Sequence, residues 1–196
     1  MTAAPEPTGS LEAALRHTTH LLESNPALAA EQAREILKAV PDNPTATLLL
    51  GVSCRLSGDV ASARRILEAL TRGLPRWAPA FFEYGMTLLE SADAHGALAA
   101  LRRAVHLQST FPDAWRTIAD LLTASGDLAG ADAAYAQHIQ TSTLDPRLML
   151  AAQALVKNQI PEAEYRLREH LKAFPTDVAA IRMLAEVAGR LGRLEI

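Results

Sequence analysis

Few side chains in this sequence are spaced for chemistry, and the first candidates are His17 and His20. Two histidines three residues apart on one helix face can bind a metal ion, but a metal site needs further ligands nearby. No third ligand is evident around them, so we interpret both as surface or interhelix residues and predict no metal site. The single cysteine, Cys54, lies among apolar residues at helical spacing, which favours a packing role.

Carboxylates could supply acid–base chemistry if two of them faced one cleft. Glu83 and Glu90 are seven residues apart on one predicted helix, and Asp120 belongs to a later helix. This arrangement is more typical of solvated charges at a rim than of an acid–base pair. The sequence contains neither a G-x-S-x-G nor an H-E-x-x-H motif. We therefore predict no catalytic residue in this chain and no cofactor.

The composition indicates helices and argues against several kinds of partner. Of the 196 residues, 49% are hydrophobic, and most of these are Ala and Leu, which favour helices. The formal net charge of -3 is spread along the chain without a basic block, so we expect no nucleic-acid partner. The absence of a signal peptide and of long apolar runs predicts a cytoplasmic protein with no membrane partner, and residues 1–9 should be disordered.

A period of 34 residues organises the chain. Gly51 and Gly85 are 34 residues apart, and Gly58 and Gly126 are separated by twice that distance. Each period holds two amphipathic segments of about 12–14 residues with apolar residues at i, i+3, i+4 and i+7. Asn or Asp should cap most of these segments, as in Asn25-Pro26, Asn43-Pro44 and Asp145-Pro146, and at Asp59, Asp93 and Asp127. We expect helices near 10–23, 26–39, 44–57, 60–73, 78–91, 94–107, 112–125, 128–141, 146–158, 161–173 and 178–191.

The repeat resembles the tetratricopeptide pattern W-x2-L-G-x2-Y, A-x3-F and P. Residues 112–145 carry Trp115, Ile118, Ala119, Leu122, Gly126, Ala131 and Tyr135 at the matching places. This resemblance implies an all-α, right-handed α-solenoid of five helical hairpins plus one unpaired helix. The hairpins would be residues 10–43, 44–77, 78–111, 112–145 and 146–177, with a partial repeat at 178–196. The fifth repeat is two residues short, and we assign the shortening to its central turn.

Side chains at the characteristic places of the pattern are expected to pack. We interpret Tyr84, Trp115 and Tyr135 as core aromatics of their repeats. His138 and His170 fall where a second helix should meet its neighbour, which favours a structural role for both.

In proteins of this kind, the resemblance implies that first helices line a concave groove that binds a peptide or protein segment. The inner-face positions that we assign to binding are Leu48, Val52, Arg55, Phe82, Met86, Arg116, Asp120 and Arg182. Phe82 and Met86 should be partly exposed there. The Lys and Asn residues of the clamp for a chaperone C-terminal carboxylate are missing from the corresponding positions, so we do not expect that ligand. The resemblance thus predicts a non-catalytic scaffold for protein–protein interaction.

A narrower resemblance is to the N-terminal repeats of bacterial tetratricopeptide-containing sulfotransferases. The run from Arg168 to Ala188 is the most specific part of it. The resemblance implies that an enzyme domain using a nucleotide sulfate donor (PAPS) follows the repeats in the parent protein and is a possible partner of them. The present chain has no phosphate-loop motif. Residues 178–191 read as a first helix without its partner, so we expect the chain to be a fragment with Arg193–Ile196 frayed.

Overall fold

The computed structural model describes residues 10–142 and 146–191, and the predictions for residues 1–9, Asp145 and Arg193–Ile196 lie outside this part. The described residues form eleven α-helices and no strand. They divide into two compact units, residues 1–107 and 108–196, with the division inside the predicted repeat 78–111. Each predicted helix is present, with bounds within two residues of the expectation.

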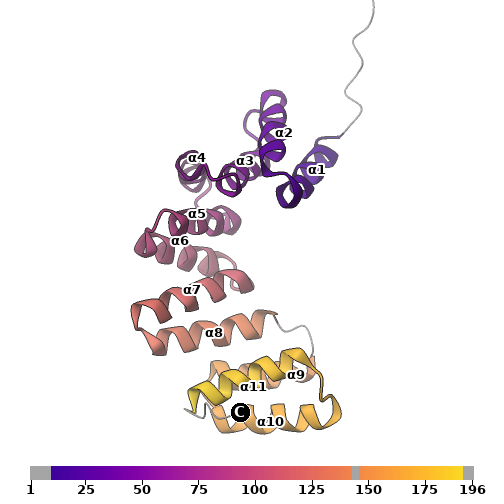
Figure 1. The fold of residues 1–196 in the computed structure, drawn as a ribbon, viewed down its shortest axis with the longest axis vertical. Coiled ribbons are helices and arrows are strands. Elements are labelled where there is room, and N and C mark those ends of the chain that lie inside the picture. The colour runs from indigo at the N-terminus through magenta and orange to yellow at the C-terminus, as the bar shows by residue number, and fades with distance from the viewer. Residues whose placement is uncertain (1–9, 143–145, 192–196) are drawn as a thin grey trace, which may run out of the picture. The chain divides into compact units, whose positions relative to one another are not determined.

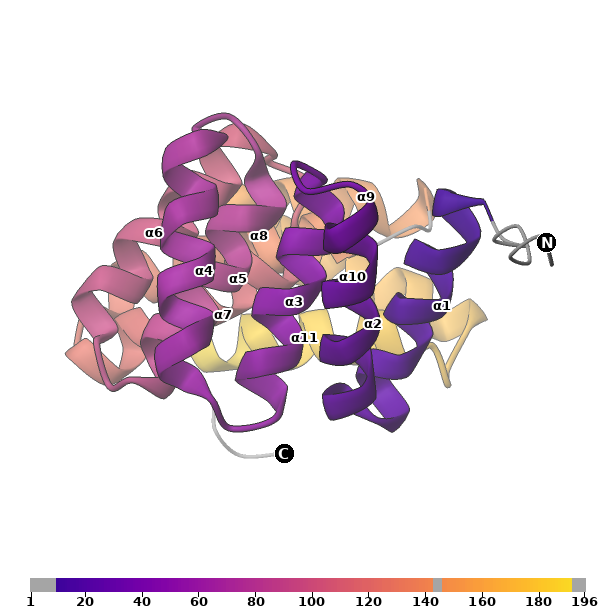
Figure 2. The same cartoon turned by 90° about the horizontal axis from the view of Figure 1, so that it is seen from above.

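The first unit consists of three helical hairpins. Each helix packs on the next one along the chain, and α3 also contacts both α1 and α5 (Figures 1 and 2). This arrangement confirms the expected hairpins of paired helices. The six helices are α1 (Leu11–Ser24), α2 (Pro26–Ala39), α3 (Pro44–Leu56), α4 (Val60–Gly73), α5 (Ala78–Glu90) and α6 (Ala94–Leu107).

The second unit has two hairpins and a further helix. Helix α7 pairs with α8 and α9 with α10, while α11 packs on α10 and also contacts α9 (Figure 1). Their bounds are α7 (Pro112–Ser125), α8 (Leu128–Ser142), α9 (Pro146–Val156), α10 (Ile160–Ala173) and α11 (Val178–Arg190). The right-handed sense of the solenoid stays a prediction.

Side-chain caps begin many of these helices, as the sequence indicates. The Asn43 side chain accepts a hydrogen bond of 2.8 Å from the Ala46 amide at the start of α3. Asp59 and Asp93 accept from the amides three residues ahead of them. Each bond satisfies an amide of the first turn that has no partner within the helix, which fixes the helix start. Asn25 and Asp127 cap in the same way.

The turns inside the hairpins share a residue with a left-handed backbone. Gly58 and Gly126 have φ values of 83° and 84°, which glycine adopts without steric cost. Ala92 and Asn158 take the same place in two other hairpins, with φ values of 60° and 55°. Asn158 follows Gly126 by 32 residues instead of 34, so the turn of the fifth repeat comes early.

The assignment of the missing two residues to the turn of the fifth repeat is wrong. Three residues separate α9 from α10, as they separate α3 from α4. Helix α9 has 11 residues, whereas α3 and α5 have 13 each. The turn keeps its length because it must place a left-handed residue before the next helix, so the first helix of the repeat is shortened instead.

Small and branched side chains make the contacts between the helices. Leu67 of α4 and Leu101 of α6 are fully buried, and each lies against a glycine of the preceding helix, Gly51 and Gly85. Tyr84 packs against the cluster around Leu67, in agreement with its expected packing role. Cys54 is buried and free, and burial raises the pKa of its thiol, which agrees with the predicted packing role.

Candidate binding site

The predicted inner-face residues of the first unit differ in how far they are exposed. Phe82 and Met86 are half-buried, and the expectation of partial exposure is confirmed for both. Leu48 is also half-buried and packs against the cluster of Leu67, Leu70 and Ala80. Val52 is only 7% exposed, so its inclusion among the groove-lining residues is wrong: its side chain packs inside the first unit.

Arg55 links two helices of the first unit. Its guanidinium donates 2.8 Å hydrogen bonds to Glu83 and to Glu90 of α5, and its side chain is 12% exposed. Burial raises the pKa of Glu83, while the neighbouring Arg55 opposes that rise. The expectation that Glu83 is a solvated rim charge is therefore wrong, because Arg55 draws it into an ion pair between α3 and α5. Arg55 therefore contributes to the packing of α3 on α5, and its role in binding stays a prediction.

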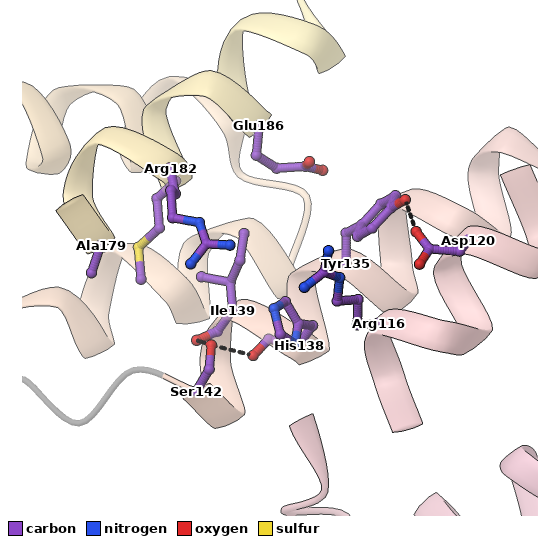
Figure 3. A pocket seen from close by; sticks show the side chains of 10 residues that line it. Arg116, Asp120, Tyr135, His138, Ile139, Ser142, Ala179, Arg182 and Glu186 are labelled. Carbon is purple, nitrogen blue, oxygen red and sulfur yellow. Dashed lines mark hydrogen bonds between the residues drawn. The ribbon is translucent and has the colours of Figure 1, made fainter. Parts of the chain in front are cut away.

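The second unit contains a cavity of about 370 Å³ that brings three predicted residues together. Ten residues line it, and they come from α7, α8 and α11 (Figure 3). Arg116 and Asp120 enter from α7, and Arg182 enters from α11. None of the ten belongs to α9, although α9 packs on α8, so the cavity lies between α11 and the hairpin of α7 and α8.

Helix α8 supplies residues that the sequence analysis assigned to packing alone. The Tyr135 hydroxyl donates a 2.6 Å hydrogen bond to the Asp120 carboxylate, which raises the pKa of Tyr135. His138 Nδ1 lies 2.9 Å from the carbonyl of Pro112, and this carbonyl can only accept, so Nδ1 carries the proton. His138 thus has the predicted structural role and also lines the cavity. Tyr135 and His138 are three residues apart along α8. This spacing is the sequence signal that places them on one face of the helix.

A buried arginine holds α11 in place beside the cavity. The Arg190 side chain is 7% exposed, and its Nε donates a 2.8 Å hydrogen bond to Glu186. Its Nη1 donates to the carbonyl of Leu155 in α9 at 3.1 Å, and its Nη2 donates to the carbonyl of Asp132 in α8. One guanidinium therefore connects three helices and neutralises Glu186. This role of Arg190 was not predicted from the sequence.

A second contact fixes the start of α11. His170 Nε2 of α10 lies 2.8 Å from the Asp177 carboxylate, which also caps α11 through the amides of Ala179 and Ala180. The hydrogen bond from His170 and those from the two amides lower the pKa of Asp177. The predicted role of His170 at a contact between helices is confirmed. These bonds position the turn of α11 that carries Arg182.

The hydrogen bonds and charged groups of the described residues bear on the chemistry open to the cavity. Ser142 donates its hydrogen bond to the carbonyl of His138 and not to an imidazole, so this bond does not activate the Ser142 hydroxyl as a nucleophile. In the described part of the chain, no three His, Cys, Asp or Glu residues are placed to hold a metal ion. Among those same residues, no helix combines the length and apolar character needed to cross a membrane.

Comparison with solved structures finds the same fold. TTC0263, a thermophilic TPR protein of Thermus thermophilus, aligns with a TM-score of 0.62 and 18% identity, covering 91% of this chain and 99% of its own. PilF of Pseudomonas aeruginosa aligns with a TM-score of 0.61 and 19% identity over 90% of this chain and 82% of its own. A chain of the APC/C hetero-tetramer Cut9–Hcn1 aligns with a TM-score of 0.60 and 15% identity, covering 94% of this chain and 37% of its own.

The family assignment comes from the sequence match. A search of curated proteins finds no match to this chain. The family profile described as tetratricopeptide repeat matches residues 20–76 and 83–146, which is more than half of the chain. Together with the helical hairpins, this match shows that the chain belongs to the tetratricopeptide repeat family.

Proposed function

We propose that this chain is a scaffold that binds a peptide segment of a partner protein, and that the cavity of the second unit is its contact site. Tetratricopeptide repeat proteins typically bind other proteins, and one of the solved structures with this fold is that of a hetero-tetramer. The observation that carries the proposal is the convergence of Arg116, Asp120 and Arg182 in one cavity.

The size and the lining of the cavity support a peptide ligand. Its volume of about 370 Å³ falls within the range of about 300–1,000 Å³ that is common for binding sites. The lining combines apolar side chains such as Ile139 and Met183 with charged side chains from α7 and α11. Such a mixture lets one ligand bury apolar surface and still form directional polar contacts.

The experiment is a selection of peptides from an unbiased displayed library against the whole chain. The decisive variant is Ala179→Trp, because Ala179 is an exposed residue that lines the cavity and a large side chain there would occupy it. The matched control is Ala185→Trp, which places the same side chain at an exposed position of the same helix, outside the cavity lining.

We expect the selected peptides to lose binding to Ala179→Trp and to keep it with Ala185→Trp. Both variants should retain the helical circular dichroism and melting temperature of the original chain, since both positions are exposed. Peptides that bound Ala179→Trp as tightly as the original chain, or a selection that enriched no peptide, would contradict the proposal. The predicted inner face of the first unit, including Leu48, Phe82 and Met86, stays a separate prediction that this experiment does not test.

The sequence resemblance adds a finer hypothesis, that the repeats serve a sulfotransferase domain in a longer parent protein. The run Arg168–Ala188 supports it, and none of the matched proteins described above is a sulfotransferase. The natural reading frame around this sequence tests it. A strand, phosphate loop and helix encoded beyond Ile196 would support the hypothesis, and a reading frame without that unit would contradict it.

A further inference from the structure

Two arginines of the cavity have no polar partner among the residues that the structure describes. Arg116 and Arg182 are both exposed, and the structure gives neither of them a hydrogen bond or an ion pair with any described residue. Their side chains extend from α7 and α11 toward the same space, so that the two guanidinium groups face one another across the cavity (Figure 3). Like charges repel, and an anion between the two would relieve that repulsion.

The carboxylates of the cavity, by contrast, already have partners. Asp120 accepts the Tyr135 hydroxyl at 2.6 Å, and Glu186 pairs with the buried Arg190 at 2.8 Å. With Arg190 included, three guanidinium groups accompany two carboxylates. The local balance is therefore positive, although the whole chain has a formal net charge of -3.

We propose that the partner segment inserts an Asp or Glu side chain between Arg116 and Arg182. This inference rests on the proposed function, because it names the chemistry of the segment that the cavity binds. The fork of a guanidinium matches a carboxylate with two parallel hydrogen bonds, and two such groups on opposite sides fix the carboxylate in position. A basic segment would bring a third cation beside two arginines that no described residue pairs, and it would find both carboxylates already hydrogen-bonded.

The negative charge of the whole chain makes the test selective. An acidic peptide gains no long-range attraction from a chain of net charge -3, so its affinity must depend on local contacts. The probes are three fluorescent peptides with a Gly-Ser frame, amidated at the C-terminus so that no terminal carboxylate takes part. The first has Asp-Glu-Glu at its centre, the second has Asn-Gln-Gln, and the third has a single phosphoserine.

Fluorescence anisotropy with the whole chain gives the dissociation constants at low and at moderate salt. We expect the acidic peptide to bind about tenfold or more tightly than its amide counterpart, with an affinity that falls as salt rises. Arg116→Gln and Arg182→Gln should each weaken binding by about three- to tenfold. The control Arg102→Gln removes one exposed arginine from the first unit and should leave the affinity unchanged.

Three outcomes would overturn the inference. These are equal binding of the acidic and amide peptides, an affinity that is insensitive to both cavity variants, and binding of the phosphoserine peptide alone. The proposed function would survive such a result if library peptides still lost their binding to Ala179→Trp. Failure of the scaffold proposal is recognised separately, by the absence of any peptide whose binding depends on the cavity.

Discussion

The close approach of α3 and α4 at Gly51 can be tested by adding a single methyl group. A Cβ atom at Gly51 would lie 2.7 Å from both Cγ and Cδ2 of Leu67, closer than carbon atoms approach without displacement. Leu67 is 0% exposed, so its side chain has no solvent to move into. Gly51→Ala should therefore destabilise the protein, although alanine is the better helix former.

The expected size follows from two opposing effects. Replacing glycine by alanine within a helix stabilises it by about 1 kcal/mol. Forcing an additional carbon into a packed interior costs about 1–3 kcal/mol. The clash at Gly51 involves the branch point of Leu67 and not only the tip of its side chain, so we place the cost near the upper value. The net loss for Gly51→Ala is then about 1–2 kcal/mol.

A double-mutant cycle separates the clash from any other effect of the substitution. Leu67→Ala alone removes a fully buried side chain and should cost about 2–5 kcal/mol. In that background the clash is absent, so adding Gly51→Ala should raise stability by about 1 kcal/mol. The change of sign corresponds to a coupling energy of about 2–3 kcal/mol between the two residues.

Urea unfolding followed by far-UV circular dichroism measures all four members of the cycle, with unchanged slopes as the condition for comparing them. Gly189→Ala in α11 is the control, because, apart from its chain neighbours and the backbone of its own helix, no described residue has an atom within 4 Å of a Cβ placed there. It should gain about 0.5–1 kcal/mol. The reasoning fails if Gly51→Ala stabilises as much as the control does, or if the effects of the Gly51 and Leu67 substitutions simply add.

Three further predictions concern the predicted inner face and the start of α11. Phe82→Ala should cost less than about 2 kcal/mol, because Phe82 is half-buried; a loss of about 3–5 kcal/mol in urea unfolding would identify it as a core residue. Arg55→Met should cost about 1–3 kcal/mol by leaving Glu83 unpaired, and adding Glu83→Gln should recover part of that loss; no recovery would show that the ion pair is not the cause. The stability that Asp177 contributes is present above the ordinary pKa of a carboxyl group and is lost as the pH falls through its lowered pKa. Asp177→Asn keeps a capping side chain without the charge, so its melting temperature should fall less steeply below about pH 4, and an unchanged slope would contradict this.

The period of the sequence determined the helices and their pairing. Apolar residues at helical spacing define one buried stripe per segment, and caps such as Asn43 and Asp59 fix where helices begin. The 34-residue spacing of Gly51 and Gly85 has a direct structural reason, since each glycine admits a leucine of the next helix. These signals act within one repeat, so local sequence was sufficient to predict them.

Only the tertiary structure decided which side chains of the predicted face are exposed and which are buried or ion-paired. Periodicity places Val52 and Arg55 on one side of α3, but whether a side chain there is buried or ion-paired depends on which neighbours reach it through space. The cavity illustrates the same limit. It needs α11 to lie opposite α7 and α8, and Arg190 holds α11 there through hydrogen bonds to carbonyls of two other helices. Contacts between repeats join residues far apart in the sequence, and the period of a single repeat carries no information about them.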